Sequence, residues 1–278
     1  SPKNIEHYDI SRGLVAYRAT LPAGPAARLE AANARDLAWV FVDGRLVGTL
    51  DTRYRRFGVD IPARRKDATV EILLYTIARV NFGMEVHDRK GLQGPVMLRS
   101  GKGKAEEVTG WEIRAIDFGA DGDLPALRWK PGRASGPAFW RGSFETGSAG
   151  DTFLDMSAWG QGIVWINGQC LGRYWSIGPT QTMFLPAPWM RPGRNEVVVL
   201  DLTGPRANRI EGRTAPILDQ LQPERDLARP PSRARPRLAG LTPVYEGQFA
   251  SGSAIQDVRF AAPAHGRQLC VEVLDAFD

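Results

Sequence analysis

The chain contains the same short hairpin pattern twice, and this repeat constrains the fold more than any other feature. Residues 40–48 read VFVDGRLVG and residues 164–172 read VWINGQCLG, at an offset of 124 residues. In each copy an apolar stretch leads into Asp-Gly or Asn-Gly, the dipeptides that best supply the two positive φ angles of a type I′ turn. We therefore expect two β-hairpins, with turns at Asp43-Gly44 and at Asn167-Gly168.

The repeat extends well beyond the hairpins. Three further blocks match in the same order, the last with one residue inserted: Gly13…Tyr17-Arg18 with Gly136…Trp140-Arg141, Ile61-Pro62 with Leu185-Pro186, and residues 71–74 with residues 196–199. Four matching blocks in one order indicate a duplicated β module. A solenoid is excluded because its repeats are much shorter.

The segments between these blocks predict strands and almost no helix. Alternating or β-branched stretches typical of strands occupy residues 13–21, 28–31, 37–42, 69–78, 96–98 and 111–118. Helical periodicity is nearly absent, which excludes a series of βα units, because each crossover would need a helical stretch. We also expect an extended arm at 53–60, hairpin turns at 64–67 and 191–194, and one short helical turn at 217–221.

These elements indicate an all-β chain that contains two antiparallel jelly-roll or galactose-binding-like β-sandwiches in tandem. We expect the first sandwich over residues 1–108 and the second over residues 109–222. A Pro/Arg-rich linker follows at 223–240, since this stretch is poor in packing residues. Renewed alternation over residues 241–278 predicts the start of a third, truncated β module.

Charge and hydropathy exclude two classes of partner. The chain has 36 basic and 31 acidic residues, and its arginines are scattered, so we expect no nucleic-acid partner. Arg53, Arg55 and Arg56, or residues 64–66, would form at most a local patch, and a solvated surface is the preferred interpretation. No apolar run reaches the length of about eighteen residues that a membrane span needs, so we expect no membrane partner.

The first residues give no targeting signal. Ser1–Asp9 lack the charged and apolar regions of a secretion signal. Because the sequence reads as an interior part of a longer protein, this observation carries little weight. We expect a periplasmic or secreted location rather than a cytoplasmic one.

Neither the cysteines nor the acidic residues form a metal or cofactor motif. Cys170 and Cys270 lie far apart, and Cys170 matches Leu46 in the repeat, which indicates a small buried hydrophobe rather than a disulfide or zinc site. Asp117, Asp121 and Asp123 offer oxygen ligands for calcium, but they lack the EF-hand pattern, and a flexible loop is the preferred interpretation. We therefore expect no cofactor and no metal.

The aromatic residues around the second hairpin are the candidate binding residues, because sugar rings stack on aromatic faces. The candidates are Trp165, Tyr174, Trp175, Trp159 and Trp189. Core or interdomain packing is the preferred interpretation for large aromatics on an alternating strand. Tyr174 and Trp175 match Leu50 and Asp51 in the first copy, so the two copies differ here, and these two residues are the better candidates for sugar contact.

Several of these segments resemble one enzyme family. Residues 151–202, from DTFLDMSAWGQG to RPGRNEVVVLDL, resemble the most recognisable non-catalytic stretch of the glycoside hydrolase family 35 β-galactosidases. The stretches YTIARVNFG (75–83), KGLQGPVML (90–98) and GWEI (110–113) fit the same family. The resemblance covers roughly residues 13–219, and the tail resembles the extended form found in some bacteria.

This resemblance implies a parent enzyme that removes terminal non-reducing β-D-galactose with retention of configuration. In that family the two catalytic glutamates lie on a TIM barrel, and no part of this sequence matches the barrel. The resemblance therefore implies that this chain is the non-catalytic β-sandwich portion, which packs on the barrel and supports it. The alternative is an autonomous carbohydrate-binding module for a galactoside or oligosaccharide, since fold alone does not separate the two.

The acidic residues of the chain do not suggest catalysis. Retaining hydrolysis needs two carboxyl groups about 5–5.5 Å apart. Glu106 and Glu107 are adjacent, so their side chains point apart on a strand or lie in a loop. His87-Asp88 would resemble a base with its orienting group, but no nucleophile motif accompanies it, and a solvated loop is the preferred interpretation. We therefore expect no catalytic residue and no activity from this chain alone.

Overall fold

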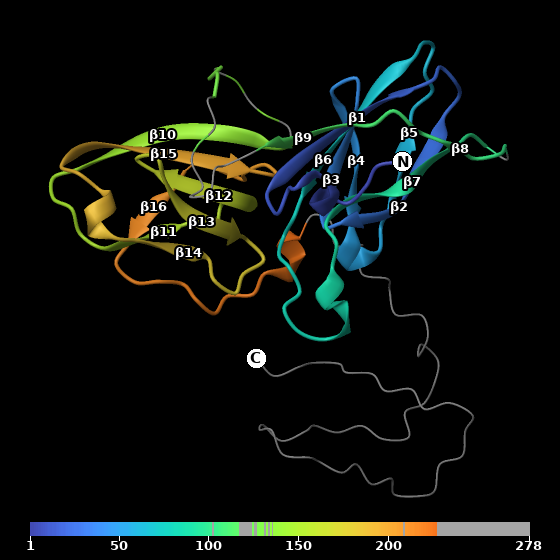
Figure 1. The fold of residues 1–278 in the computed structure, drawn as a ribbon. Coiled ribbons are helices and arrows are strands. Elements are labelled where there is room, and N and C mark those ends of the chain that lie inside the picture. The colour runs from blue at the N-terminus through green and yellow to red at the C-terminus, as the bar shows by residue number, and fades with distance from the viewer. Residues whose placement is uncertain are drawn as a thin grey trace, which may run out of the picture. The chain divides into compact units, whose positions relative to one another are not determined.

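The computed structural model describes residues 1–101, 103–116, 124, 127–130, 132, 134, 136–207 and 209–226 (Figure 1). The candidate calcium residues Asp117, Asp121 and Asp123, the linker beyond residue 226 and the expected third module lie outside the described residues. No α-helix occurs in the described part, which contains strands and five short 3₁₀ turns. These turns are Ile5–Tyr8, Thr52–Tyr54, Met84–His87, Ala187–Trp189 and Pro223–Arg225.

The first half forms two antiparallel sheets that enclose a core. The five-stranded sheet has the order β4-β3-β6-β1-β9, and the four-stranded sheet has the order β5-β2-β7-β8. The strands of the first sheet are β1 (Leu14–Leu21), β3 (Leu37–Val42), β4 (Arg45–Asp51), β6 (Ala68–Tyr75) and β9 (Glu112–Ile116). Those of the second are β2 (Ala27–Arg35), β5 (Gly58–Ile61), β7 (Gly91–Arg99) and β8 (Glu106–Glu107).

The second half repeats this arrangement with fewer strands. Its sheets have the orders β10-β15-β12-β13 and β14-β11-β16. The strands of the larger sheet are β10 (Ala138–Thr146), β12 (Gln161–Ile166), β13 (Gln169–Trp175) and β15 (Gly193–Asp201). Those of the smaller sheet are β11 (Thr152–Asp155), β14 (Thr182–Leu185) and β16 (Glu211–Arg213). The chain is thus all-β, with two sandwiches in tandem, as the sequence predicts.

The two hairpins at the centre of the repeat have the same local geometry. Asp43 and Gly44 have φ angles of 47° and 75°, and Asn167 and Gly168 have φ angles of 51° and 85°, which are the signs that a type I′ turn requires. Each hairpin also has a bulge at the equivalent place, after Val40 in one and after Val164 in the other. A duplicated module explains this agreement.

The two sandwiches share a third core, which lies between their larger sheets. Leu37 and Trp39 from β3 pack in one cluster with Ile163 and Trp165 from β12. The equivalent strand of each copy therefore faces the other copy, and both larger sheets are apolar on two faces. This double burial explains why all six residues of β12 are buried, whereas a strand with one solvated face would alternate.

Five predictions about particular segments were wrong. β9 pairs with β1, so the first sandwich extends to Ile116, beyond the expected boundary at 108. The turns at 64–67 and 191–194 join strands of opposite sheets and are not hairpins. The arm at 53–60 begins within the 3₁₀ turn at Thr52–Tyr54, and residues 217–221 are not helical.

The hairpin turns give a direct test of this architecture. Gly168→Val and Gly44→Val should each destabilise the chain by about 1–2 kcal/mol, because a β-branched residue must then adopt a left-handed conformation. A Cβ at either position would meet no atom within 4 Å, so the cost would come from the backbone alone. Thermal melts would measure it, with Arg45→Ala, at an exposed position beside the first turn, as the control. A Gly168→Val chain that melts like the parent would contradict the turn.

Candidate functional site

The loop between β6 and β7 exposes an unusual amount of apolar surface. Phe82 is 89% exposed, Met84 is 99% exposed and Val86 is 51% exposed. Single exposed apolar residues are common on soluble proteins, but a group of large ones on one loop marks an interaction surface. We call residues 77–90 the docking loop.

A buried cluster of charges fixes the base of the docking loop. The Lys90 ammonium lies 2.8 Å from both carboxylate oxygens of Asp36 and 2.5 Å from an oxygen of Asp88. The Ile77 N–H donates to Asp36 at 2.7 Å, so both ends of the loop are tied to one carboxylate. The prediction that Asp88 lies in a solvated loop was therefore wrong, because its side chain is only 3% exposed and pairs with Lys90.

Arg173 joins the docking loop to the second sandwich. Its guanidinium donates a hydrogen bond to the carbonyl of Ile77 and lies 5.3 Å from the ring centre of Tyr75. Arg173 belongs to β13, as do Tyr174 and Trp175. Side chains alternate along a strand, so Arg173 and Trp175 face the first sandwich while Tyr174 faces the core of the second.

A pocket of about 460 Å³ adjoins this strand. It is lined by Met156, Arg173, Tyr174, Trp175, Ser176, Gly178, Pro179, Thr180, Gln181, Thr182 and Met183. The Gln181 amide group donates to the carbonyls of Ser176 and Gln220 at 3.0 and 2.9 Å, which fixes its orientation. Its buried Oε1 has no hydrogen-bond partner among the described residues.

The structure brings two of the five candidate sugar-binding residues, Tyr174 and Trp175, together in this pocket. Tyr174 is buried, and its hydroxyl donates to Asp201 at 2.6 Å, so the side chain lines the pocket while being held in the core. Trp175 is half-buried, and the Arg53 guanidinium lies 4.6 Å from its ring centre. Trp165 lies elsewhere, fully buried 6.1 Å from Phe139 in the shared core, where its ring has no face open to a sugar.

Arg53 connects Trp175 to a group of buried carboxylates. Its guanidinium contacts Asp51 at 2.6 Å and Asp226 at 2.7 Å, and the Tyr54 hydroxyl donates to Asp226 at 2.6 Å. These pairs outweigh the cost of burial and raise the pKa of Arg53. The site next to Trp175 therefore keeps a fixed positive charge over one face of the indole ring.

The site has the features of a binding surface and lacks those of a hydrolytic centre. None of the residues that line the pocket is Asp or Glu, so it lacks the carboxyl pair of a glycosidase. Glu106 and Glu107 lie on β8, at the edge of the other sheet of the first sandwich. The described residues contain no group of three or more His, Cys, Asp or Glu side chains that could hold a metal ion.

Sequence reasoning did not identify the docking loop or its ion cluster. Asp36 and Lys90 are distant in the sequence, and only the pairing of β2 with β7 brings them together. The one available signal was the alternation of Phe82, Met84 and Val86, whose period of two is typical of a strand although the structure has no strand here.

Comparisons with known proteins identify both sandwiches. Residues 2–117 match the family model described as the β-galactosidase first all-beta domain, and residues 137–195 match the β-galactosidase galactose-binding domain. Among curated relatives, a β-galactosidase of Xanthomonas manihotis is 32% identical over 66% of this chain and 30% of its own length. Human beta-galactosidase-1-like protein 3 is 35% identical over 72% of this chain and 31% of its own length. The chain thus spans less than a third of either relative.

Solved structures give only distant likenesses. The lectin of Pleurotus ostreatus is 13% identical, covers 73% of this chain and 75% of its own, and has a TM-score of 0.28. A β-galacturonidase of Eisenbergiella tayi is 16% identical over 79% of this chain and 36% of its own, with a TM-score of 0.29. In the part of the chain that the structure describes, no helix is long and apolar enough to cross a membrane.

The buried Tyr174 predicts a pH dependence of stability. Burial and the adjacent Asp201 carboxylate raise the pKa of Tyr174 well above its ordinary value of about 10. The folded state therefore holds the neutral phenol, and the stability that it contributes is fully present below pH 10 and is lost as the pH rises further. Each pH unit above 10 should cost about 1.4 kcal/mol for this group.

Tyr174→Phe tests this dependence. The variant should lose about 1.5–3 kcal/mol at pH 8, because a hydrogen bond to a charged group is removed. Its free energy of unfolding should then fall less steeply above pH 10 than that of the parent. Burial also raises the pKa of Tyr17, to about 12, so some alkaline loss should remain. Urea unfolding from pH 8 to 11 would measure both effects, with the exposed Tyr8→Phe as the control. If the free energy of unfolding falls equally steeply above pH 10 in the unsubstituted chain and in Tyr174→Phe, the pH dependence does not come from Tyr174.

Proposed function

We propose that this chain, which contains two β-galactosidase domains, is the non-catalytic β-sandwich portion of a retaining β-galactosidase of glycoside hydrolase family 35, of the bacterial type. The parent enzyme hydrolyses terminal non-reducing β-D-galactose residues. The catalytic TIM barrel belongs to another part of the parent enzyme, and this chain packs against that barrel and supports it. The chain alone has no catalytic role.

The docking loop is the observation that supports this proposal most strongly. Phe82 and Met84 are exposed in the middle of a loop whose two ends are fixed by contacts with the buried Asp36 carboxylate. An apolar loop on a rigid support suits a partner that covers it permanently, because ordering the loop on binding then costs little conformational entropy. The two matched domains and the small share of each relative's length that they span agree with this interpretation.

The pocket beside Trp175 has a secondary role in this proposal. It adjoins the docking loop through Arg173 and Ile77, so a partner seated on the loop would lie close to it. We propose that Trp175 and Tyr174 contribute the sugar-facing wall of a rim that receives the distal part of a galactoside or oligosaccharide. Trp165 has no part in this wall, because it is buried in the shared core.

The second candidate function is an autonomous carbohydrate-binding module. The aromatic wall of the pocket favours it. It differs from the first candidate in one testable respect, because it requires sugar binding by the chain alone and no partner on the docking loop.

The double substitution Phe82→Ser with Met84→Ser tests the docking role. In this chain alone it should leave the melting temperature nearly unchanged, because both side chains are already exposed. In the parent enzyme it should cost about 3 kcal/mol, since two apolar side chains then lose a buried contact. The matched control is Phe184→Ser, which removes an exposed aromatic from β14 of the second sandwich. Equal melting of the parent enzyme and its double variant would reject the docking role.

Activity measurements complete this test. The chain alone should release no galactose from a chromogenic β-galactoside, because its pocket lacks a carboxyl pair. Turnover by the pure chain that is abolished by substituting one of its own acidic residues would overturn the proposal. Galactose binding by the chain, together with an unaffected double variant of the parent, would favour the autonomous module.

A further inference from the structure

The second sandwich is less complete at one edge than the first, although the two share one topology. In the first sandwich, β9 extends one sheet beyond β1 and β8 extends the other beyond β7. In the second sandwich, β10 and β16 are the outermost strands among the described residues. Two strand edges are therefore left without a ladder partner in the part of the chain that the structure describes. Such edges favour the addition of another strand.

In the first sandwich, two segments outside the strands close the gap between the two sheets at this edge. Ile5 is fully buried in the core, and its N–H donates to the Lys90 carbonyl at 2.9 Å. Val108 is buried as well, and its N–H donates to the Val96 carbonyl at 2.8 Å. The gap is thus filled by branched apolar side chains whose backbones bond to the sheet.

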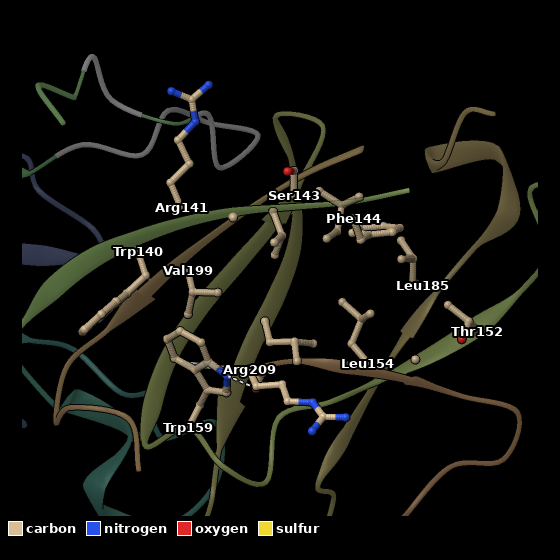
Figure 2. Close-up of a pocket in the computed structure, with 15 residues that line it drawn as sticks. Trp140, Arg141, Ser143, Phe144, Thr152, Leu154, Trp159, Leu185, Val199 and Arg209 are labelled. Atoms are coloured by element: carbon tan, nitrogen blue, oxygen red, sulfur yellow. Dashed lines mark hydrogen bonds between the residues drawn. The ribbon is translucent and has the colours of Figure 1, made fainter. Parts of the chain in front are cut away.

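The equivalent gap in the second sandwich is a cavity of about 430 Å³ between β10 and β16, shown in Figure 2. We call it the mouth. Its apolar walls include Trp140, Phe144, Leu154, Trp159, Val199 and Ile210. In Figure 2 the labelled Phe144 and Leu154 lie between the strands, while the labelled Arg141 points away from them. The mouth is therefore distinct from the pocket beside Trp175, whose lining shares none of these residues.

The strand register explains why the mouth is empty of the chain's own side chains. Leu98 pairs with Leu29 in the first sandwich, and Gly212 pairs with Leu154 at the equivalent place in the second. Leu98 fills the first core, whereas Gly212 has no side chain to fill the second.

A buried polar group also points to a missing partner. The indole Nε1–H of Trp140 is buried and has no hydrogen-bond partner among the described residues. Trp140 occupies the position of Tyr17, whose hydroxyl accepts from the Leu92 N–H at 3.1 Å. A buried donor without an acceptor is costly, and a peptide carbonyl in the mouth would satisfy it.

We propose that the mouth binds an extended peptide segment of the parent enzyme, which adds a strand at the edge of β10 and inserts a Val- or Ile-sized side chain. A backbone carbonyl of the segment accepts from Trp140. The occupant is peptide rather than sugar, because a peptide backbone supplies both the ladder partner that the edge of β10 lacks and the carbonyl that Trp140 needs. The mode is strand addition, in which the backbone supplies affinity and alternate side chains fill pockets. This inference rests on the proposed function, since it requires a longer parent enzyme.

Hydrogen exchange on the parent enzyme and on this chain alone tests the inference. The amides of β10 and β16 should exchange at least tenfold more slowly in the parent, while those of β14 should exchange equally in both. The docking loop is followed in the same experiment. A protected docking loop with an unprotected mouth would overturn this inference and leave the proposed function intact. If neither is protected, the proposed docking fails, and the inference fails with it.

Two further hydrogen-exchange measurements test for other occupants of the mouth. Galactose added to the chain alone would protect β10 if the mouth were a sugar site. Protection that grows with the concentration of the chain alone would indicate a second copy as the occupant. Either result would overturn the inference.

Gly212→Leu gives an independent measurement. It supplies the side chain that the first sandwich has at Leu98, and a Cβ at this position meets only Thr152 Oγ1, at 3.2 Å. In this chain alone, Gly212→Leu should melt at the same temperature as the unsubstituted chain or at a higher one, because the new side chain fills the mouth. It should melt at a lower temperature in the parent enzyme, because it displaces the inserted segment. The control is Gly147→Leu, where a Cβ meets no atom within 4 Å; a shift of the same sign in both proteins would count against the inserted segment.

Discussion

The apolar contact between the two larger sheets is the interaction on which the rest of the structure depends. Each of these sheets already covers the core of its own sandwich with one face, and the shared cluster covers the other face. Trp39 and Trp165, from equivalent strands of the two copies, both belong to this cluster. Burying large aromatics gives each several kcal/mol of favourable transfer free energy, so this contact holds the two sandwiches in one fixed relation.

That fixed relation places the functional features beside one another. Arg173 of the second sandwich reaches the carbonyl of Ile77 at the start of the docking loop, and Arg53 of the first sandwich covers Trp175 of the second. The docking loop and the pocket therefore share one surface although they belong to different copies of the module. The proposed role as a support for a catalytic domain requires such rigidity, since small displacements of groups near an active site are costly to catalysis.

Much of the fold follows from local sequence signals, because strands and two-residue turns depend on neighbouring residues. Asp43-Gly44 and Asn167-Gly168 adopt the positive φ angles that their residue types favour, and the repeat predicts that the two copies share a topology. The boundary at 108 failed because β9 lies after a loop and returns to β1, which no local pattern indicates. The ion cluster of Lys90 was missed for a similar reason, since its partners meet only through the tertiary fold. Trp165 and Trp175 look alike in the sequence, and only the packing of the two sheets separates a core residue from a pocket residue.

The central claim is that the shared core makes the two sandwiches a single cooperative unit, and calorimetry of this chain with Trp165→Ala tests it most directly. The unsubstituted chain should unfold in one transition whose calorimetric and van't Hoff enthalpies agree. Trp165→Ala should cost about 3–5 kcal/mol and should lower the stability of strands in both sandwiches, as measured by hydrogen exchange in β2 and β11. Two separate transitions in the unsubstituted chain, together with a Trp165→Ala effect on the stability of the second sandwich only, would contradict the claim.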